Sequence, residues 1–203
     1  MLFGATGFVG RLTARHLAAH APSGVRVALA GRSRHRLEHT RAALGEVAAG
    51  WPILVTDALD TRQMTRLAES TRVVATTVGP YVTYGRELVG ACAAAGTHYT
   101  DLTGEVLFVR QSIDDNHKPA QRTRARLVHG CGFEALPSDL GVWLTAQTAA
   151  ADDAGELTRV LSHVRSLSGG ISGGTIDTAR QQALAAAASP RARRILADPY
   201  ALS

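Results

Sequence analysis

Three glycines near the start of the chain, Gly4, Gly7 and Gly10, are spaced three residues apart in the run Gly4-Ala-Thr-Gly-Phe-Val-Gly10. The run lies between a predicted strand and a predicted helix, a context in which the first glycine permits a tight turn. The second lets backbone N–H groups approach a pyrophosphate, and the third lets the helix pack closely on the sheet. The run predicts a nucleotide-binding turn, for which the alternative is a purely structural glycine turn. The residues predicted to contact the cofactor here are Gly4, Thr6, Gly7, Phe8, Val9 and Gly10.

The second chemical signal follows the second predicted strand, where the chain reads Gly31-Arg32-Ser33. Sites specific for NAD place an acid at this point to bind the ribose hydroxyls, and an acid would repel a 2′-phosphate. Arg32 can instead bind that phosphate with its guanidinium, and Ser33 can donate a hydrogen bond to it. We therefore predict NADP(H) as the cofactor; the alternative is a solvated surface arginine. Arg36, one turn further on, assists or faces water.

Residues at the ends of the next two predicted strands extend this site. Asp57 follows the third strand, where it accepts a hydrogen bond from the adenine amino group or begins the next turn. Gly79 and Pro80 end the fourth strand and should border the nicotinamide ribose, because ligands bind at the carboxyl ends of parallel strands. Tyr81 and Tyr84 follow in the same loop. Each phenol is a candidate catalytic donor of a proton or hydrogen bond, although packing of the loop against the cofactor is the favoured alternative.

Other polar residues have plainer interpretations. Glu105 is expected to cap its own helix as an acid in the first turn, and His129 to be a partly buried, hydrogen-bonded histidine. Cys131 either lines the site or is a small buried cysteine. The sequence contains no HExxH helix, no Tyr-xxx-Lys pair and no Ser-His-Asp order, and we predict no metal site.

The elements that must position these residues alternate along the first two-thirds of the chain. Short apolar runs predict strands at 1–3, 25–30, 53–56, 73–78, 98–102 and 127–129, and amphipathic helices separate them. Ser33, Asp60 and Gly96 are predicted helix caps, and Pro119 is expected to end or kink a helix near Lys118. This alternation predicts an α/β fold, a Rossmann-type doubly wound parallel sheet.

The pattern changes after about residue 140. Leu140, Trp143 and Leu144 predict a helical face, and alternating residues at 157–164 predict a strand. A glycine-rich loop at 168–174, a helix at 175–188 and a polar, basic tail complete the chain. We predict an NADP-binding Rossmann domain with a shortened first strand at 1–140. Residues 141–203 are expected to begin a second α+β domain, an incomplete substrate or dimerisation domain.

Composition excludes several classes of protein. The 203 residues are 45% hydrophobic and 19% charged, which excludes a disordered chain, a coiled coil and a collagen-like repeat. No apolar run is long enough to span a bilayer, and no secretory signal is evident. The two distant cysteines, Cys92 and Cys131, indicate no disulfide framework and favour the cytoplasm. The net charge of +5 comes from scattered arginines with only 5% aromatic residues, so we expect an anionic cofactor or acidic carrier and no nucleic acid.

Five blocks in this order resemble the saccharopine-dehydrogenase-like oxidoreductases, and within them the actinobacterial trans-acting enoyl reductases. The similarity extends from Leu2 to about Thr178. The blocks are Gly4–Gly10, Ala30–Ser33, Thr76–Gly85, Tyr99–Glu105 and His129–Gly141. The resemblance implies NADPH-dependent reduction of a double bond on a carrier-bound chain, for a polyketide synthase without a working reductase domain, in phthiocerol-type and phenolic glycolipid assembly. The partner that it implies is the synthase, or an acyl-carrier domain bearing an enoyl thioester. It is also compatible with a homodimer and with a location at the periphery of a membrane.

Members of this family usually run to about twice this length, so the resemblance implies that the chain is a truncated member. Two other functions stay open. One is an amino-acid oxidoreductase of the saccharopine type, which needs cations for the substrate carboxylates. The other is an NADP-binding fragment without catalysis.

Overall fold

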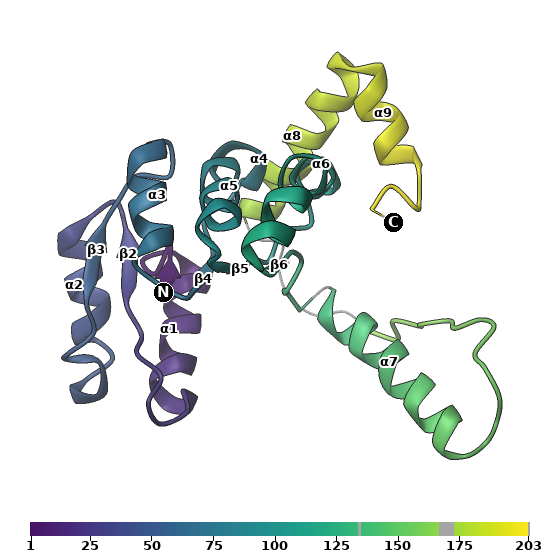
Figure 1. Cartoon of the computed structure of the whole chain (residues 1–203), viewed down its shortest axis with the longest axis horizontal. Helices are drawn as coiled ribbons and strands as arrows, with labels where there is room; N and C mark the ends of the chain where they lie inside the picture. Colours follow the sequence, from purple (N-terminus) through teal and green to yellow (C-terminus); the bar gives the residue numbers. More distant parts are fainter. Residues whose placement is uncertain (134, 167–172, 203) are drawn as a thin grey trace.

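The computed structural model describes residues 1–133, 135–166 and 173–202. Within these residues, six parallel strands form one sheet in the order β3-β2-β1-β4-β5-β6 (Figure 1). The strands are β1 Leu2–Phe3, β2 Leu29–Gly31, β3 Ile53–Val55, β4 Val73–Thr76, β5 His98–Thr100 and β6 Leu127–Val128. The strand order reverses between β1 and β4, the point at which doubly wound sheets bind their ligands. The predicted fold class is confirmed.

Both faces of the sheet are buried beside β1 and β2, because neighbouring side chains in a strand point to opposite faces. Leu2 and Leu29 pack in one apolar cluster, and Phe3 and Ala30 pack in the other. The first cluster lies under α1 (Phe8–His20) and α2 (Arg34–Ala42), which contribute Ala14 and Leu37 to it. The second lies under α3 (Thr61–Glu69), α5 (Arg86–Ala95) and α6 (Val106–Thr123). Short turns of helix occur at η1 (Glu46–Ala48) and α4 (Tyr81–Tyr84).

The strand register brings the ends of the central strands together. Phe3 of β1 pairs with Ala30 of β2 on one side and with Thr76 of β4 on the other. The residues that follow these three strands therefore meet at one edge of the sheet. This edge carries the glycine turn, Arg32 and the Gly79–Pro80 loop.

Three predicted helix caps are present. The hydroxyl of Ser33 accepts a hydrogen bond from the N–H of Arg36 at 3.4 Å and begins α2. The Asp60 carboxylate accepts one from the N–H of Gln63 at 3.0 Å and begins α3. Gly96 ends α5 with φ +75°, a conformation in which a side chain is unfavourable.

Of the two expectations for Pro119, an end or a kink of the helix near Lys118, the first is wrong, because α6 continues to Thr123, and the kink stays a prediction. Proline removes one helical hydrogen bond, but tertiary contacts hold the last turn. Ala120 is buried, and the hydroxyl of Thr123 donates to the carbonyl of Ala93 on α5 at 2.6 Å. Arg124 then ends the helix with φ +63°.

The C-terminal third differs from its prediction at two places. Helix α7 (Leu136–Ala151) leads away from the sheet, and α8 (Gly173–Ala188) and α9 (Pro190–Ala197) lie near α6 (Figure 1). The strand predicted at 157–164 is wrong, since these residues have no regular structure and no described strand pairs with them. Helix α9 was not predicted, although Ser189 caps it with Pro190 in its first turn.

Two expectations for this region are not settled by the described residues. Of the predicted glycine-rich loop, residues 168–172 lie outside them, whereas Gly173 and Gly174 begin α8. The domain division after residue 140 falls inside α7 and stays a prediction. No helix in the described part of the chain has both the length and the apolar character needed to cross a membrane.

Candidate cofactor-binding groove

A groove of about 220 Å³ lies where β1, β2, β3 and β4 end. It gathers most of the predicted cofactor residues, namely Gly4, Thr6, Gly7, Arg32, Ser33, Asp57 and Gly79, together with Tyr84. Five predicted residues do not line it. These are Phe8, Val9, Gly10, Pro80 and Tyr81. A second cavity, of about 340 Å³, lies apart from these residues, between α6 and β6, and none of the predicted cofactor residues lines it.

The three glycines of the turn have three different environments. Gly4 has φ +88°, and a Cβ on it would lie 2.7 Å from the Thr77 hydroxyl. A Cβ on Gly10 would lie 2.1 Å from the carbonyl oxygen of Gly4, so α1 can approach the strand only without a side chain there. A Cβ on Gly7 would meet one atom, the same carbonyl oxygen at 3.4 Å, and would otherwise enter open space. These environments match the roles of turn, helix packing and pyrophosphate approach expected of the motif.

The end of the groove beside β2 is basic. Arg32, Ser33 and Arg36 line it together. Neither arginine takes part in an ion pair within the described residues. The Ser33 hydroxyl accepts the capping hydrogen bond from Arg36 and can still donate its own proton. Two guanidiniums that form no ion pair within the described residues, together with a hydroxyl, suit a phosphate group.

Asp57 lines the groove and also shapes the turn after β3. Its carboxylate accepts a hydrogen bond from the N–H of Leu59 at 3.0 Å, and its own N–H donates to the Gln63 side chain at 2.9 Å. The two predicted roles, a contact to adenine and a start of the next turn, are therefore compatible.

The opposite end of the groove is formed by the turn before α4. Gly79 is joined to Pro80 by a cis peptide bond. Tyr81 is 5% exposed, its hydroxyl donates to the carbonyl of Thr76 at 3.2 Å, and its ring lies 5.8 Å from that of Phe108. This geometry supports the packing alternative for Tyr81. Tyr84 lines the groove and is the candidate phenol that reaches it.

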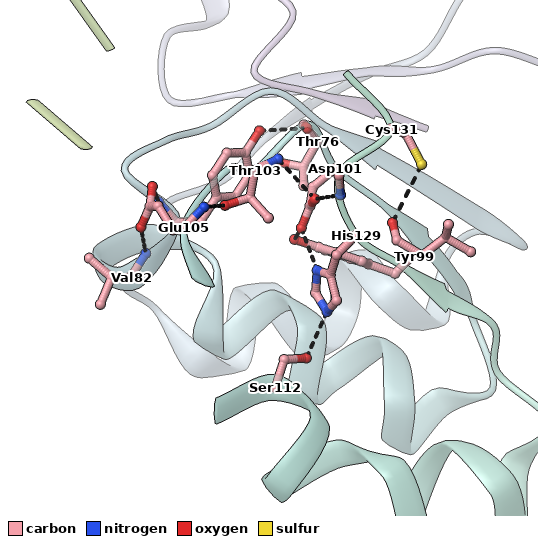
Figure 2. A network of polar contacts seen from close by, with 12 residues as sticks. Thr76, Val82, Tyr99, Asp101, Thr103, Glu105, Ser112, His129 and Cys131 are labelled. Atoms are coloured by element: carbon pink, nitrogen blue, oxygen red, sulfur yellow. Dashed lines mark hydrogen bonds and ion pairs between the residues drawn. The ribbon is translucent and has the colours of Figure 1, made fainter. Parts of the chain in front are cut away.

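Glu105 holds this turn from behind, a role that we did not predict. The expectation that it caps its own helix is wrong, because its side chain makes no capping bond to α6. Its carboxylate instead accepts hydrogen bonds from the N–H groups of Tyr81 at 2.8 Å and Val82 at 2.7 Å, two residues at the start of α4 (Figure 2). The side chain is 2% exposed. The partners lie more than twenty residues away in the chain, so no local pattern could have indicated them.

A buried network continues from Glu105 to the loops after β5 and β6 (Figure 2). Asp101 accepts hydrogen bonds from the N–H groups of Thr103 at 3.1 Å and Gly130 at 3.0 Å. His129 Nδ1 lies 2.7 Å from Asp101 Oδ2, and its Nε2 lies 2.9 Å from Ser112 Oγ. The interpretation of His129 as a partly buried, hydrogen-bonded histidine is confirmed.

Tyr99 donates its hydroxyl to Asp101 Oδ2 at 2.9 Å. Burial raises the pKa of the Tyr99 phenol well above its ordinary value, and the Asp101 carboxylate raises it further. The phenol therefore stays protonated and serves as a hydrogen-bond donor to the network. Cys131 is part-exposed and does not line the groove. No cluster of three metal-ligating side chains occurs among the residues with described positions.

The sheet order and the glycine groove at its switch point define a dinucleotide-binding domain of the Rossmann type. The chain belongs to the family described as Saccharopine dehydrogenase NADP binding domain, which matches residues 1–131. The cofactor is accordingly NADP(H), as predicted from Arg32 and Ser33 after β2.

Several relatives are similar along the whole chain. A Mycobacterium tuberculosis protein with the provisional name trans-acting enoyl reductase is 54% identical over 203 residues, which are all of this chain and 48% of that protein. A trans-acting enoyl reductase of Mycobacterium bovis is 48% identical over 204 residues, or 49% of its length. The chain thus spans about half the length of the curated relatives it matches.

Among solved structures, apo saccharopine dehydrogenase (L-Glu forming) from Saccharomyces cerevisiae superposes with a TM-score of 0.59 at 15% identity. The match covers 74% of this chain and 31% of that one. At this identity the likeness shows the fold alone.

Proposed function

We propose that this chain is the cofactor-binding part of an NADPH-dependent trans-acting enoyl reductase. The observation that carries the proposal is the groove itself, in which a glycine turn leads to two guanidiniums that make no ion pair within the described residues. Such a groove fits a dinucleotide with an additional phosphate on its adenosine. The names of relatives that are 48–54% identical support the reaction class.

Different residues of the groove would bind different parts of the cofactor. The N-terminus of α1, which begins after its N-cap Gly7, would face the pyrophosphate. Arg32, Ser33 and Arg36 would hold the 2′-phosphate, and Asp57 the adenine edge. Gly79, which lines the groove, would border the nicotinamide ribose. The reduced cofactor supplies a hydride when bound.

The protein must also supply a donor for the proton or for the carbonyl oxygen of the substrate. Tyr84 is the phenol on the groove, and we propose it as this donor. We propose an enoyl thioester carried by a polyketide synthase or an acyl-carrier domain as substrate, in assembly of lipids of the phthiocerol and glycolipid type. The word trans-acting in the names of the relatives supports a separate synthase as partner.

The test compares Arg32 and Arg34, the two arginines that flank Ser33 in the sequence. Arg32→Ala removes a groove guanidinium, whereas Arg34→Ala removes one that pairs with Glu38 at 3.8 Å and does not line the groove. Because a charge-assisted contact is worth about 1.5–3 kcal/mol and Arg32 is exposed, we expect NADPH binding to weaken about tenfold. NADH binding should change less than about twofold, and Arg34→Ala should leave both unchanged.

Calorimetric titration of each variant with both cofactors measures these effects. Equal losses of affinity for NADPH and NADH in Arg32→Ala would contradict the proposal that Arg32 binds the 2′-phosphate. The reaction itself is tested by NADPH oxidation with an enoyl thioester and, separately, with saccharopine. We expect oxidation with the thioester only; turnover of saccharopine would support the amino-acid alternative. Tight binding without turnover on either would define a cofactor-binding module.

A further inference from the structure

We infer that Glu105 is a positioning residue for the nicotinamide end of the groove, an inference that rests on the proposed NADPH site. Glu105 does not line the groove, so it would act through the residues that do. Its two oxygens receive the first two N–H groups of α4, the helix that joins Gly79–Pro80 to Tyr84.

The start of α4 needs an acceptor from elsewhere in the chain. Its N-cap residue is Pro80, whose side chain has no polar atom to accept a hydrogen bond from the first turn. Glu105 supplies the missing acceptor in a buried environment, where an unpaired N–H is unfavourable. The N–H of Tyr84 donates to the carbonyl of Pro80 at 3.0 Å, which ties the backbone of the groove phenol to the start of the turn.

Glu105 is itself held by neighbours that resist displacement. Its N–H donates to the Thr103 hydroxyl at 3.0 Å, and the N–H of Thr103 donates to Asp101. Asp101 in turn contacts His129, which reaches Ser112 on α6 (Figure 2). The carboxylate therefore projects from a segment that is fixed to the sheet and to α6, and it can define where α4 begins.

The C-terminal part of the chain reaches the same carboxylate. The Thr178 hydroxyl on α8 donates to Glu105 Oε1 at 3.1 Å. The same oxygen accepts from the N–H of Tyr81. A carboxylate can accept several hydrogen bonds at once, so one side chain joins α4, the loop after β5 and α8.

Glu105→Gln keeps the size of the side chain but replaces one acceptor oxygen by an NH₂ donor. One N–H of Tyr81 or Val82 then loses its partner, and the turn that carries Gly79 and Tyr84 should shift. Glu87→Gln is the matched control, since Glu87 accepts a hydrogen bond from Thr61 at 2.7 Å on an exposed surface outside the groove.

Binding of two different ligands distinguishes an effect at one end of the groove from an effect at the other. Adenosine 2′,5′-bisphosphate occupies only the basic end, and NADPH occupies both. We expect Glu105→Gln to bind the bisphosphate within about twofold of wild type and NADPH about tenfold more weakly. The emission maximum of bound NADPH, which reports on the nicotinamide, should shift. Glu87→Gln should match wild type in all three measurements.

Unchanged NADPH affinity and emission in folded Glu105→Gln would overturn the inference. An equal loss of both ligands would overturn it too, because it indicates general disruption of the fold. Should Glu105→Gln not fold, Glu105→Asp retains the charge on a shorter side chain, and its ratio of NADPH to bisphosphate affinity should fall; an unchanged ratio would refute positioning. Failure of wild type to bind either ligand would instead count against the proposed function.

Discussion

The same substitution, glycine to alanine, should affect two glycines of one turn differently. Gly10→Ala places a methyl group 2.1 Å from the Gly4 carbonyl oxygen and 2.9 Å from the Ala5 Cα, both of which are backbone atoms. Gly7→Ala places one 3.4 Å from a single atom, at a backbone conformation (φ −73°, ψ 172°) that alanine adopts readily. We expect the first change to destabilise the fold and the second to impair binding.

The distances from each new methyl group to its neighbours determine the expected losses of stability and affinity. Overpacking a rigid contact typically costs 1–3 kcal/mol, and a methyl group 2.1 Å from a backbone oxygen belongs at the upper end, about 3 kcal/mol. For a chain of this length this corresponds to a decrease in Tm of about 6–12 °C. Gly7→Ala replaces a favourable N-cap residue and should cost about 1 kcal/mol or less. Its methyl group enters the space predicted for the pyrophosphate, so affinity for NADPH and NADH should both fall about tenfold or more.

Thermal unfolding followed by circular dichroism and cofactor titration at a temperature where both variants are folded would separate the two effects. A Tm of Gly10→Ala within about 2 °C of wild type would refute the packing argument. NADPH affinity of Gly7→Ala equal to that of wild type would refute the placement of the pyrophosphate over this residue.

Two further predictions concern ionisable groups. Burial raises the pKa of the Cys92 thiol to about 12, so iodoacetamide at about pH 8 should label only the part-exposed Cys131 in the folded chain. In denaturant it should label both cysteines. Equal labelling rates of the two cysteines in the folded chain, measured by mass spectrometry, would contradict this prediction. The hydrogen bond from the Gln63 N–H holds the pKa of Asp60 below its ordinary value of 3.8. The ionised carboxylate therefore stabilises the fold fully at pH values above 3.8, and this stabilisation is lost as the pH falls through the lowered pKa. The difference in Tm between wild type and Asp60→Asn should therefore narrow from about pH 5 to about pH 2, and a constant difference would exclude the charge as its cause.

The groove could be predicted from the sequence because its residues follow strands. In a parallel sheet the carboxyl ends of strands share one edge, so Gly4, Arg32, Asp57 and Gly79 had to lie near one another once the strands were recognised. The glycine spacing also indicated that the helix packs closely on the sheet at Gly10, where a Cβ would lie 2.1 Å from the Gly4 carbonyl oxygen. Short sequence distances and regular geometry made these inferences possible.

Tertiary contacts explain the elements that were predicted wrongly. Pro119 does not end α6 because the Thr123 hydroxyl and buried Ala120 hold its last turn. The alternation at 157–164 is typical of a strand, but a strand also requires a neighbour with which to exchange hydrogen bonds, and no described strand pairs with these residues. Val164 is 81% exposed as a result.

The two ends of the groove are built by different physical means. At the basic end, the exposed side chain of Arg32 follows β2 directly and that of Arg36 lies in the first turn of α2, so a substitution there should alter which phosphate pattern is bound while leaving the backbone in place. At the opposite end, Gly79 and Tyr84 belong to a turn whose position depends on a buried carboxylate from a distant segment. Substitutions in that network should therefore change the geometry around the nicotinamide without changing cofactor preference. The choice of NADP over NAD can thus be inferred from a few neighbouring residues, whereas the placement of the reactive end depends on contacts such as that of Glu105 with Val82, which only the folded chain creates.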